Sequence, residues 1–416
     1  MLITVRININ NQKISPFFEL LIRKPLLDRI LCTITNIGHL HFSEQMNILI
    51  NCSNLKKGGG LQVADSVCTC LNTIPQHHFF LVLSSYMDDT ADRVSKYQNV
   101  TVVRHDIQNS WCTLFWGRDK VMDNLVARHN IDGVLTIFGP ARWAPKCNHL
   151  CGFARSHLVL NDSPYFQRMA WKEIMIEKVR NLYLYYYFKR GVTAFWTENP
   201  YISEKVKHLF PTIKAYTVSN YYNQVFDDEN NQIEHALPSF DGCTLLSINT
   251  SYPHKNLAIA IEVARYLKKH YSEFNFRFVF TVTENDLPPI PSYLREHFCL
   301  IDKVSVAECP SLYRQADIMF QPTLLECFTA TYVEAMRMQV PILTTDLPFA
   351  HGLCGNAAVY YSPLDAEDCA KSIYKMAVDT SFQDYLVGEG IKQLKSFDNY
   401  NRRAEKLIDL ISNLDD

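Results

Sequence analysis

Short apolar runs recur along this chain in two separate series, and this alternation constrains the fold more than any other feature. The first series begins at Met46 and continues at 79–84, 100–104, 133–138, 157–161, 193–197 and 215–220. The second comprises 243–248, 276–282, 298–301, 317–322, 341–345 and 358–361. Parallel strands that are buried on both faces are this apolar, and the stretches between them suit helices. The pattern therefore predicts an α/β protein with two parallel sheets.

The boundaries of the two series suggest a domain plan. At 416 residues the chain is too long for one ordinary core. The polar, acidic stretch 222–241 has no periodicity and marks a break. We expect an N-terminal extension at 1–45, a first Rossmann-like domain at 46–222, a linker at 223–241, a second Rossmann-like domain at 242–380 and C-terminal helices at 381–416.

The sequence pattern of the first 45 residues differs from that of the rest of the chain. They carry mixed apolar and basic patches without clear strand–helix alternation. We interpret them as an extension, or as sequence upstream of a start at Met46. Central strands within this segment would contradict that hypothesis.

Composition limits the choice of partners and location. The net charge of −2 predicts no general attraction to nucleic acid. No run of about eighteen apolar residues is present, so we expect no membrane-spanning helix. The thirteen cysteines, an odd number, suit reduced thiols in a cytoplasmic protein. A peripheral contact with the inner face of the membrane is left open.

One cluster of cysteine and histidine residues could suggest a metal site. Cys147, His149 and Cys151 lie close together in sequence. A zinc site would need a fourth ligand and a customary spacing, and neither is visible. We therefore predict no metal and no cofactor.

Two glutamates in the second series have the spacing of a ligand site. Glu326 falls in a loop after an apolar run, and Glu334 falls in a helix for which Thr329 is the expected N-cap. A helix rises about 1.5 Å per residue, so the two carboxylates can lie roughly 10 Å apart. That distance suits two hydroxyl-bearing ends of one ligand, with an anion between them at the helix N-terminus. Two ordinary solvated glutamates are the alternative.

The surrounding residues resemble the family 4 glycosyltransferases, which are retaining sugar transferases of the GT-B fold. Their signature is a pair of glutamates at this spacing, followed by Ala-Met and a later proline. It matches here at Glu326, Glu334, Ala335, Met336 and Pro341.

The resemblance implies a GT-B fold, with two Rossmann-like domains whose parallel sheets face each other across a cleft. It also implies that Glu334 holds the ribose of a nucleotide sugar and that Glu326 contacts the donor sugar. The amides of Phe328, Thr329 and Ala330 would contact sugar hydroxyls or phosphate. Cys327 replaces the family's usual glycine and fits only if its φ is negative.

A glycine run follows the first apolar run. Gly58, Gly59 and Gly60 would let the backbone approach a ligand and would leave N–H groups free for phosphate. The family resemblance implies that Gly59 and Gly60 abut the donor diphosphate. A flexible loop is the alternative.

Lys255 opens the expected helix 255–269, where its charge opposes the helix dipole unless an anion is shared. The resemblance implies that Lys255 neutralises the leaving diphosphate. The family often has an arginine five residues earlier, and Thr250 stands there instead. The resemblance also implies that the nucleotide base meets the backbone near Val304. A surface lysine is the alternative for Lys255.

Two features of the first series are less specific. Asp162 follows the expected strand 157–161, where relatives carry an acid facing the donor sugar, so the resemblance implies a catalytic role; a turn is the alternative. Residues 169–190 form an aromatic and basic helix, which we interpret as a core helix rather than a membrane-surface or lipid-acceptor contact.

These observations predict a retaining glycosyltransferase that moves a sugar from a nucleotide diphosphate donor to an acceptor hydroxyl. The resemblance implies a glycan or lipid-linked acceptor, a role in polysaccharide or lipid-linked glycan synthesis, and independence of metal. Two alternatives stay open: a catalytically silent GT-B protein that binds a nucleotide sugar or glycan, and a sugar-nucleotide epimerase of the same fold.

Overall fold

The first half of the molecule is built on a seven-stranded parallel sheet with strand order β3-β2-β1-β4-β5-β6-β7. Its strands are β1 (Asn47–Cys52), β2 (His78–Leu83), β3 (Val100–Arg104), β4 (Gly133–Thr136), β5 (Asn148–Gly152), β6 (Ala194–Thr197) and β7 (Lys214–Thr217). This computed structural model describes residues 45–56 and 58–414. The expectations for residues 1–44 lie outside the described residues.

A second parallel sheet of six strands has the order β10-β9-β8-β11-β12-β13. Its strands are β8 (Cys243–Ser247), β9 (Phe276–Phe280), β10 (Phe298–Leu300), β11 (Ile318–Gln321), β12 (Ile342–Thr345) and β13 (Ala358–Tyr361). The prediction of two parallel α/β sheets is confirmed.

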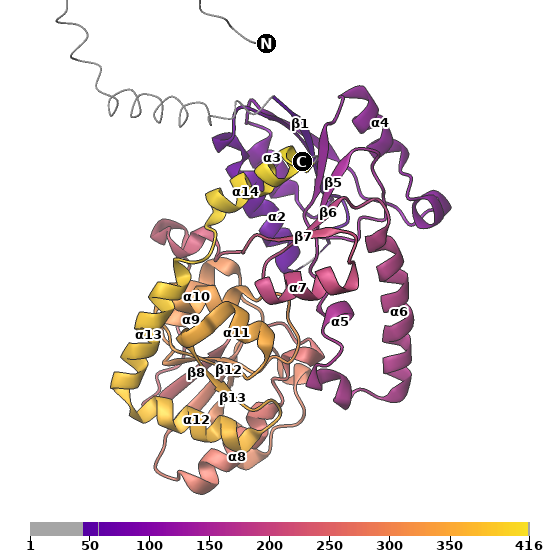
Figure 1. Ribbon diagram of the computed structural model, residues 1–416. Helices are drawn as coiled ribbons and strands as arrows, with labels where there is room; N and C mark the ends of the chain where they lie inside the picture. The colour runs from indigo at the N-terminus through magenta and orange to yellow at the C-terminus, as the bar shows by residue number, and fades with distance from the viewer. Residues whose placement is uncertain (1–44, 57, 415–416) are drawn as a thin grey trace, which may run out of the picture. The chain divides into compact units, whose positions relative to one another are not determined.

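Helices follow most strands and cover the faces of the sheets (Figure 1). With the first sheet lie α2 (Gly59–Thr69), α3 (Asp88–Val94), α4 (Lys120–Arg128), α5 (Ser156–Val159), α6 (Trp171–Lys189) and α7 (Pro200–Leu209). With the second lie α8 (Ile259–His270), α9 (Cys309–Arg314), α10 (Ala330–Met338), α11 (Pro348–Cys354), α12 (Ala366–Val378) and α13 (Thr380–Leu394). The last helix is α14 (Tyr400–Ser412).

The strand order places a crevice in each sheet. In the first sheet the order turns between β1 and β4, and in the second it turns between β8 and β11. Helices leave on opposite faces at such a switch point, so a ligand crevice opens at the carboxyl ends of the strands there. The glycine run follows β1, and the loop with Glu326 follows β11. Both sequence motifs are therefore brought to switch points.

The last helix packs against the first sheet rather than the second. The side chains of Ala404, Leu407, Ile408 and Ile411 on α14 are buried in the same apolar cluster as β1 and α2. The side chain of Arg403 donates to Ser66 Oγ on α2 at 2.7 Å. The chain thus returns to its first sheet after completing the second.

One predicted strand of the first sheet is wrong. Residues 157–161 do not form a strand, since α5 occupies Ser156–Val159, and β5 lies earlier at Asn148–Gly152. The apolar run at 157–161 is buried as a short helix, whose Leu158 and Val159 pack into the core. A short apolar run cannot by itself distinguish a strand from a buried helical turn.

The interpretation of residues 169–190 as a core helix is also wrong for most of its apolar side chains. Of α6, only Glu177, Tyr187 and Phe188 are buried, whereas Leu182 is 72% exposed. Among the residues that the structure describes, no helix has the length and apolarity needed to cross a membrane.

Candidate functional site

A cavity of about 310 Å³ opens at the carboxyl ends of the second sheet. Its walls come from the loops after β8, β9, β10 and β11, and they include Asn249, Thr250, Thr281, Val304, Thr329 and Glu334. Thr281 Oγ1 donates to the backbone oxygen of Asn249 at 2.9 Å, and Asn249 Nδ2 donates to Gln321 Oε1 at 2.6 Å. Buried hydrogen bonds therefore tie these loop ends together.

A neighbouring cavity of about 330 Å³ has walls from both sheets. The first half of the molecule contributes Gly59, Gly60 and Glu198, and the second contributes Phe328, Ala330 and Glu334. Gln62, Ala330 and Glu334 line both cavities, so the two spaces adjoin along α10.

Glu334 is the acid that both cavities share. Its side chain is 7% exposed and accepts a hydrogen bond from the hydroxyl of Tyr313 at 3.0 Å. Burial raises the pKa of Glu334 to about 7, and the hydrogen bond from Tyr313 partly offsets this rise. A buried carboxyl with one oxygen held by tyrosine leaves the other available to a ligand hydroxyl.

Glu326 was expected to contact the donor sugar, but its carboxylate contacts other side chains of the protein. Its Oε1 lies 2.5 Å from Lys255 Nζ and accepts a hydrogen bond from Thr323 Oγ1 at 2.9 Å. Both partners of this ion pair are nearly buried. In the described part of the chain, Glu326 lines neither of the two cavities, whereas Lys255 lines the smaller one. Lys255 therefore stands between Glu326 and the cavity.

The expected position of Lys255 at a helix N-terminus is wrong. Lys255 ends a 3-10 turn, Pro253–Lys255, and α8 begins only at Ile259. Asn256 then adopts a left-handed backbone with φ 53°, which Asn tolerates better than most residues. The charge of Lys255 is balanced by the Glu326 carboxylate, so no helix dipole has to be overcome.

The glycine run forms the N-terminal edge of α2. Only Gly58 has a left-handed φ, at 76°, and it is the N-cap residue of the helix. A Cβ at Gly59 would meet no atom within 4 Å, which matches its position on the cavity wall. The backbone of this loop is thus open to the cavity.

The N-terminus of α10 faces the shared wall. Thr329 is the N-cap residue, but its side chain makes no capping hydrogen bond. Its Oγ1 lies 3.0 Å from Thr331 Oγ1 instead. The first N–H groups of an uncapped helix need another partner, and an anion fits this position. Cys327 does not have a left-handed φ. Cysteine can therefore stand at this position in place of the family's glycine.

Two site residues were missed from the sequence. Glu198, at the end of β6, and Arg403, on α14, both line the larger cavity although each is over 90% buried. Glu198 Oε1 and Arg403 Nε are buried without a hydrogen-bond partner in the described structure. Burial raises the pKa of Glu198 to about 7, although Arg403 opposes this rise. No local motif marks either residue, because Arg403 arrives only when α14 returns.

The structure separates Asp162 from the other predicted residues. Asp162 is exposed, its carboxylate lies 3.7 Å from Lys205 Nζ, and it lines neither cavity. Val304 lines the smaller cavity next to Lys303. With Thr250 at the position of the family's arginine, Lys255, Lys303 and Arg403 supply the positive charge around the two cavities.

His149 has both ring nitrogens engaged. Its Nε2 lies 2.8 Å from Thr136 Oγ1, and its Nδ1 lies 2.6 Å from the backbone oxygen of Gly191. Burial lowers the pKa of His149 to about 4. This histidine therefore acts as a hydrogen-bonded part of the first sheet.

Comparison with known proteins finds a family match for the part of the chain that holds the second sheet. The family of glycosyl transferases group 1 matches residues 243–379. The O-antigen chain mannosyltransferase RfbU of Salmonella typhimurium is 27% identical over 133 residues, which are 31% of this chain and 36% of that protein. The match thus spans about a third of that relative's length.

Solved structures share the fold over most of the chain. A glycosyltransferase from Rickettsia africae has a TM-score of 0.64 at 13% identity, over 89% of this chain and 98% of that one. Anabaena HepE, solved with UDP and glucose, has a TM-score of 0.58 at 11% identity, over 89% of this chain and 100% of that one. Residues 243–379 thus match the glycosyl transferases group 1 family, and the chain shares its two-sheet GT-B fold with solved glycosyltransferases.

Proposed function

We propose that the chain is a retaining glycosyltransferase that moves a sugar from a nucleoside diphosphate donor to an acceptor hydroxyl. The observation that carries this proposal is the placement of Glu334, Lys255 and the N-terminus of α10 around one cavity. These groups supply a hydroxyl acceptor, a positive charge and free N–H donors. A nucleotide sugar presents ribose hydroxyls and a diphosphate in the same order.

The smaller cavity suits the nucleotide part of the donor. The Glu334 carboxylate accepts hydrogen bonds from the ribose hydroxyls, and the base lies against the backbone near Val304. Lys255 and the amides of Thr329 and Ala330 face the diphosphate. As the bond between the anomeric carbon and the diphosphate breaks, these fixed charges stabilise the leaving group, and such preorganised stabilisation is usually the largest catalytic contribution.

Glu326 acts mainly through Lys255 in this proposal. The 2.5 Å ion pair fixes the lysine ammonium at the cavity wall. A contact between Glu326 and the donor sugar would require this pair to open. We therefore treat Lys255 as the group that touches the donor and Glu326 as its positioning residue. Asp162 is left out of the proposed site.

The larger cavity suits the acceptor and the transferred sugar. Its wall joins the open backbone of Gly59 and Gly60 to the unpartnered carboxyl oxygen of Glu198. Tyr221 and Phe328 add aromatic surface on which a sugar ring can pack. An acceptor hydroxyl here attacks the anomeric carbon, and its proton leaves with the diphosphate. A polysaccharide or lipid-linked glycan under assembly supplies such a hydroxyl, in line with the O-antigen relative.

A thermal-shift panel of UDP-, GDP- and ADP-sugars tests the donor assignment. One nucleotide class should raise the unfolding temperature, since a ligand that binds only the folded state stabilises it. The Glu334→Gln variant should lose most of that shift. Turnover of the stabilising donor, including slow hydrolysis, separates an enzyme from a silent binding protein. Release of an epimerised donor without acceptor product would favour the epimerase alternative.

A further inference from the structure

Helix α6 carries its apolar side chains on the outside. Trp171, Met175, Val179, Leu182 and Tyr186, the outer stripe, are between 50% and 72% exposed. Their spacing of three or four residues places them on one face, because a helix turns by about 100° per residue. In a surface helix of a globular protein this face normally packs on the core.

The helix is nevertheless firmly attached through its opposite face. Glu177 there is 6% exposed and accepts hydrogen bonds from Arg155 at 2.6 Å and from Arg180 at 2.9 Å. Phe188 is fully buried in the core of the first sheet. The outward orientation of the stripe is therefore fixed by packing and by the ion pairs of the buried Glu177 carboxylate.

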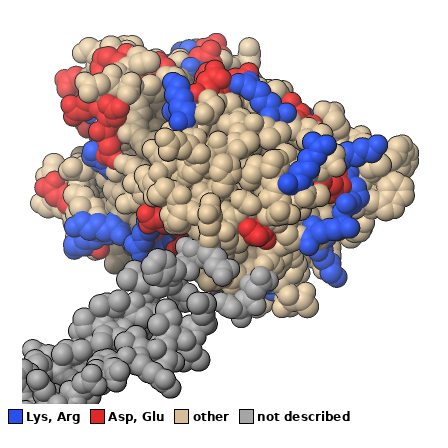
Figure 2. Space-filling view, turned by 90° about the horizontal axis from the view of Figure 1, so that it is seen from above, with Lys and Arg blue, Asp and Glu red and all other residues tan. Residues whose placement is uncertain are grey.

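Basic residues border the outer stripe. Lys172, Lys178 and Lys189, the basic flank, lie within about 60° of its centre on the helix circumference. Glu173 lies on the other side and accepts a hydrogen bond from the backbone N–H of Ala170 at 2.9 Å. Figure 2 shows blue side chains gathered toward the side on which α4 and α6 lie in Figure 1.

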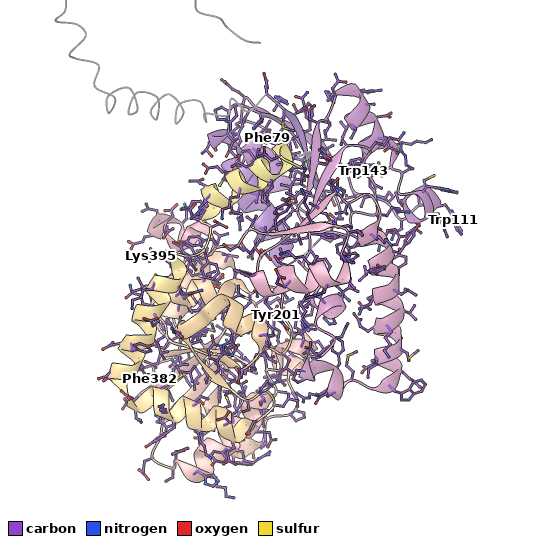
Figure 3. All side chains as sticks on the ribbon, viewed as in Figure 1. Phe79, Trp111, Trp143, Tyr201, Phe382 and Lys395 are labelled. Carbon is purple, nitrogen blue, oxygen red and sulfur yellow. The ribbon has the colours of Figure 1, made fainter. Side chains whose placement is uncertain are left out.

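A second exposed apolar element adjoins the end of α6. In the turn of residues 111–116, Trp111 is 72% exposed, Phe115 56% and Trp116 66%. Trp111 lies at the outer edge of the molecule, beyond the upper end of α6 (Figure 3). Tyr187 donates to the backbone oxygen of Leu114 at 2.6 Å, which ties this aromatic turn to the helix.

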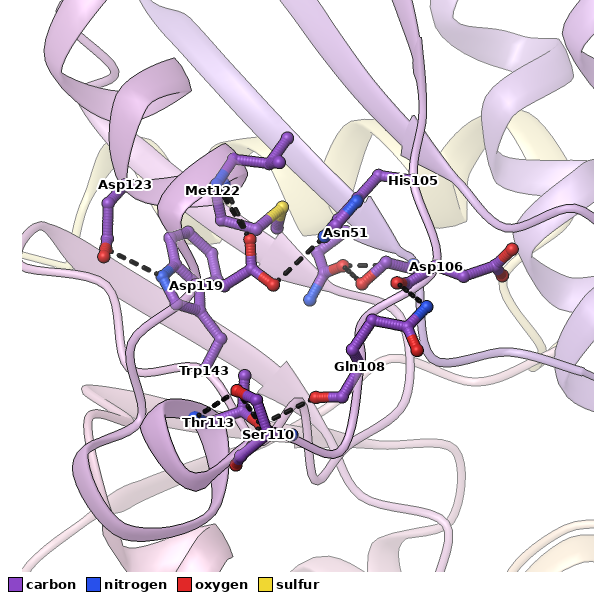
Figure 4. Close-up of polar contacts among 12 residues, drawn as sticks. Asn51, His105, Asp106, Gln108, Ser110, Thr113, Asp119, Met122, Asp123 and Trp143 are labelled. Atoms are coloured by element: carbon purple, nitrogen blue, oxygen red, sulfur yellow. Dashed lines mark hydrogen bonds and ion pairs between the residues drawn. The ribbon is translucent and has the colours of Figure 1, made fainter.

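The base of the aromatic turn is held by its own hydrogen bonds (Figure 4). Thr113 Oγ1 donates to the backbone oxygen of Gln108 at 2.6 Å. Just beyond the turn, Asp119 caps α4 through the N–H of Val121 at 3.0 Å and lies 3.1 Å from His105 Nε2. The exposed rings thus project from a fixed support.

We propose that the α6 face, formed by the outer stripe, the basic flank and the aromatic turn, docks onto the surface of a bilayer that contains anionic lipids. Apolar and tryptophan side chains bordered by lysine are the pattern that inserts at the boundary between headgroups and acyl chains. A second copy of this chain would bring the basic flanks toward each other, whereas anionic headgroups neutralise them. This inference goes beyond the proposed function and does not depend on it.

Vesicle flotation with Val179→Glu tests the apolar part of the face. Wild-type protein should float with vesicles of phosphatidylcholine and phosphatidylglycerol. Val179→Glu should bind at least about tenfold more weakly, since it places a charge on the exposed apolar face that would enter the bilayer. Val378→Glu is the matched control, because Val378 is 59% exposed at the end of α12 on the second half of the molecule. Equal loss in both variants, or no binding of the wild type, would overturn the proposal.

A charge comparison tests the basic flank. The double variant Lys172→Gln/Lys178→Gln should reduce vesicle binding about 30-fold, because each lysine near an anionic surface contributes about 1 kcal/mol. Lys371→Gln/Lys392→Gln removes two exposed lysines elsewhere and should leave binding unchanged. Equal wild-type binding to pure phosphatidylcholine vesicles would contradict the role of anionic lipid. A vesicle-free dimer that Val179→Glu dissociates would assign the face to a second copy.

Discussion

The two sheets have the same architecture, but the side chains around them differ in which kinds are buried and which are exposed. Around the second sheet, the charged groups Glu326 and Glu334 are buried, Lys255 is nearly buried, and all three hold defined partners beside a cavity. Around the first sheet, apolar side chains such as Trp171 and Leu182 are left in solvent. Burying charge and exposing apolar surface both cost stability, so each is expected where a ligand or a partner compensates.

The difference teaches where each half of the molecule is specialised. The second half concentrates the groups suited to an anionic, hydroxyl-rich donor, and the first half presents an extended surface. If this division is right, substitutions near the second sheet change kinetics, and substitutions on the α6 face change surface binding. The following experiments test the division from the largest expected effect to the smallest.

Replacing Lys255 should have the largest effect. Lys255→Ala should lower kcat about 10²–10³-fold, because it removes a fixed charge from the leaving diphosphate. The variant should also unfold at a lower temperature, since Glu326 is left buried without its partner. Steady-state kinetics and thermal unfolding measure the two effects.

A double variant separates catalysis from stability at the same position. Lys255→Ala/Glu326→Gln removes the unpaired charge and should recover much of the unfolding temperature without recovering kcat. Recovery of both would show that Lys255 acts only through folding.

Glu334→Gln should have the next largest effect. The variant keeps the volume and a partner for Tyr313 but loses the charge, so donor KM should rise about tenfold to 100-fold, as for the loss of a hydrogen bond to a charged group. Glu367→Gln, at an exposed glutamate of α12, is the control. An unchanged donor KM in Glu334→Gln would show that the donor does not bind at the cavity wall formed by Glu334.

The pH dependence should be more modest. The pKa of Glu334 is raised from 4.5 to about 7, so its carboxylate is lost as pH falls through 7, and donor KM should rise several-fold between about pH 8 and pH 6. Glu334→Gln should flatten this profile.

The contribution of Glu334 to folding stability should change with pH in the direction opposite to its contribution to donor binding. Between pH 4.5 and about 7, folded Glu334 retains a proton that the unfolded chain has released, so its contribution to the free energy of unfolding falls as pH rises. Denaturant unfolding of wild type and Glu334→Gln across this range should show the difference. If the free energy of unfolding of the wild type, relative to that of Glu334→Gln, instead increased as pH rises, the raised pKa would be contradicted.

Asp162→Asn should have the smallest effect. Its side chain is exposed beside Lys205 and lines neither cavity, so kcat and donor KM should stay within about twofold of wild type. A large drop in kcat would mean that the first half of the molecule contributes a catalytic acid and would break the comparison.

Prediction from sequence succeeded unevenly between the halves. The loop after β11 and the helix with Glu334, which begins directly after Thr329, follow from apolar periodicity, which acts within a few residues, although the Thr329 side chain makes no capping hydrogen bond. At 157–161 the same reasoning failed, because burial of an apolar run is shared by strands and helical turns. The prediction that residues 169–190 form a core helix failed for a different reason, since an apolar helix face predicts burial but does not specify what covers it.

The sequence by itself determined two parallel α/β sheets, the glycine run just after a strand of the first sheet, and the loop and helix with Glu326 and Glu334 after a strand of the second, because strand periodicity and chain direction place such segments at one edge of a sheet. Tertiary structure alone decided that Lys255 pairs with Glu326, that Arg403 and Glu198 reach the larger cavity and that Asp162 does not. The reason is that these contacts depend on how helices and loops far apart in sequence pack, which local periodicity does not encode.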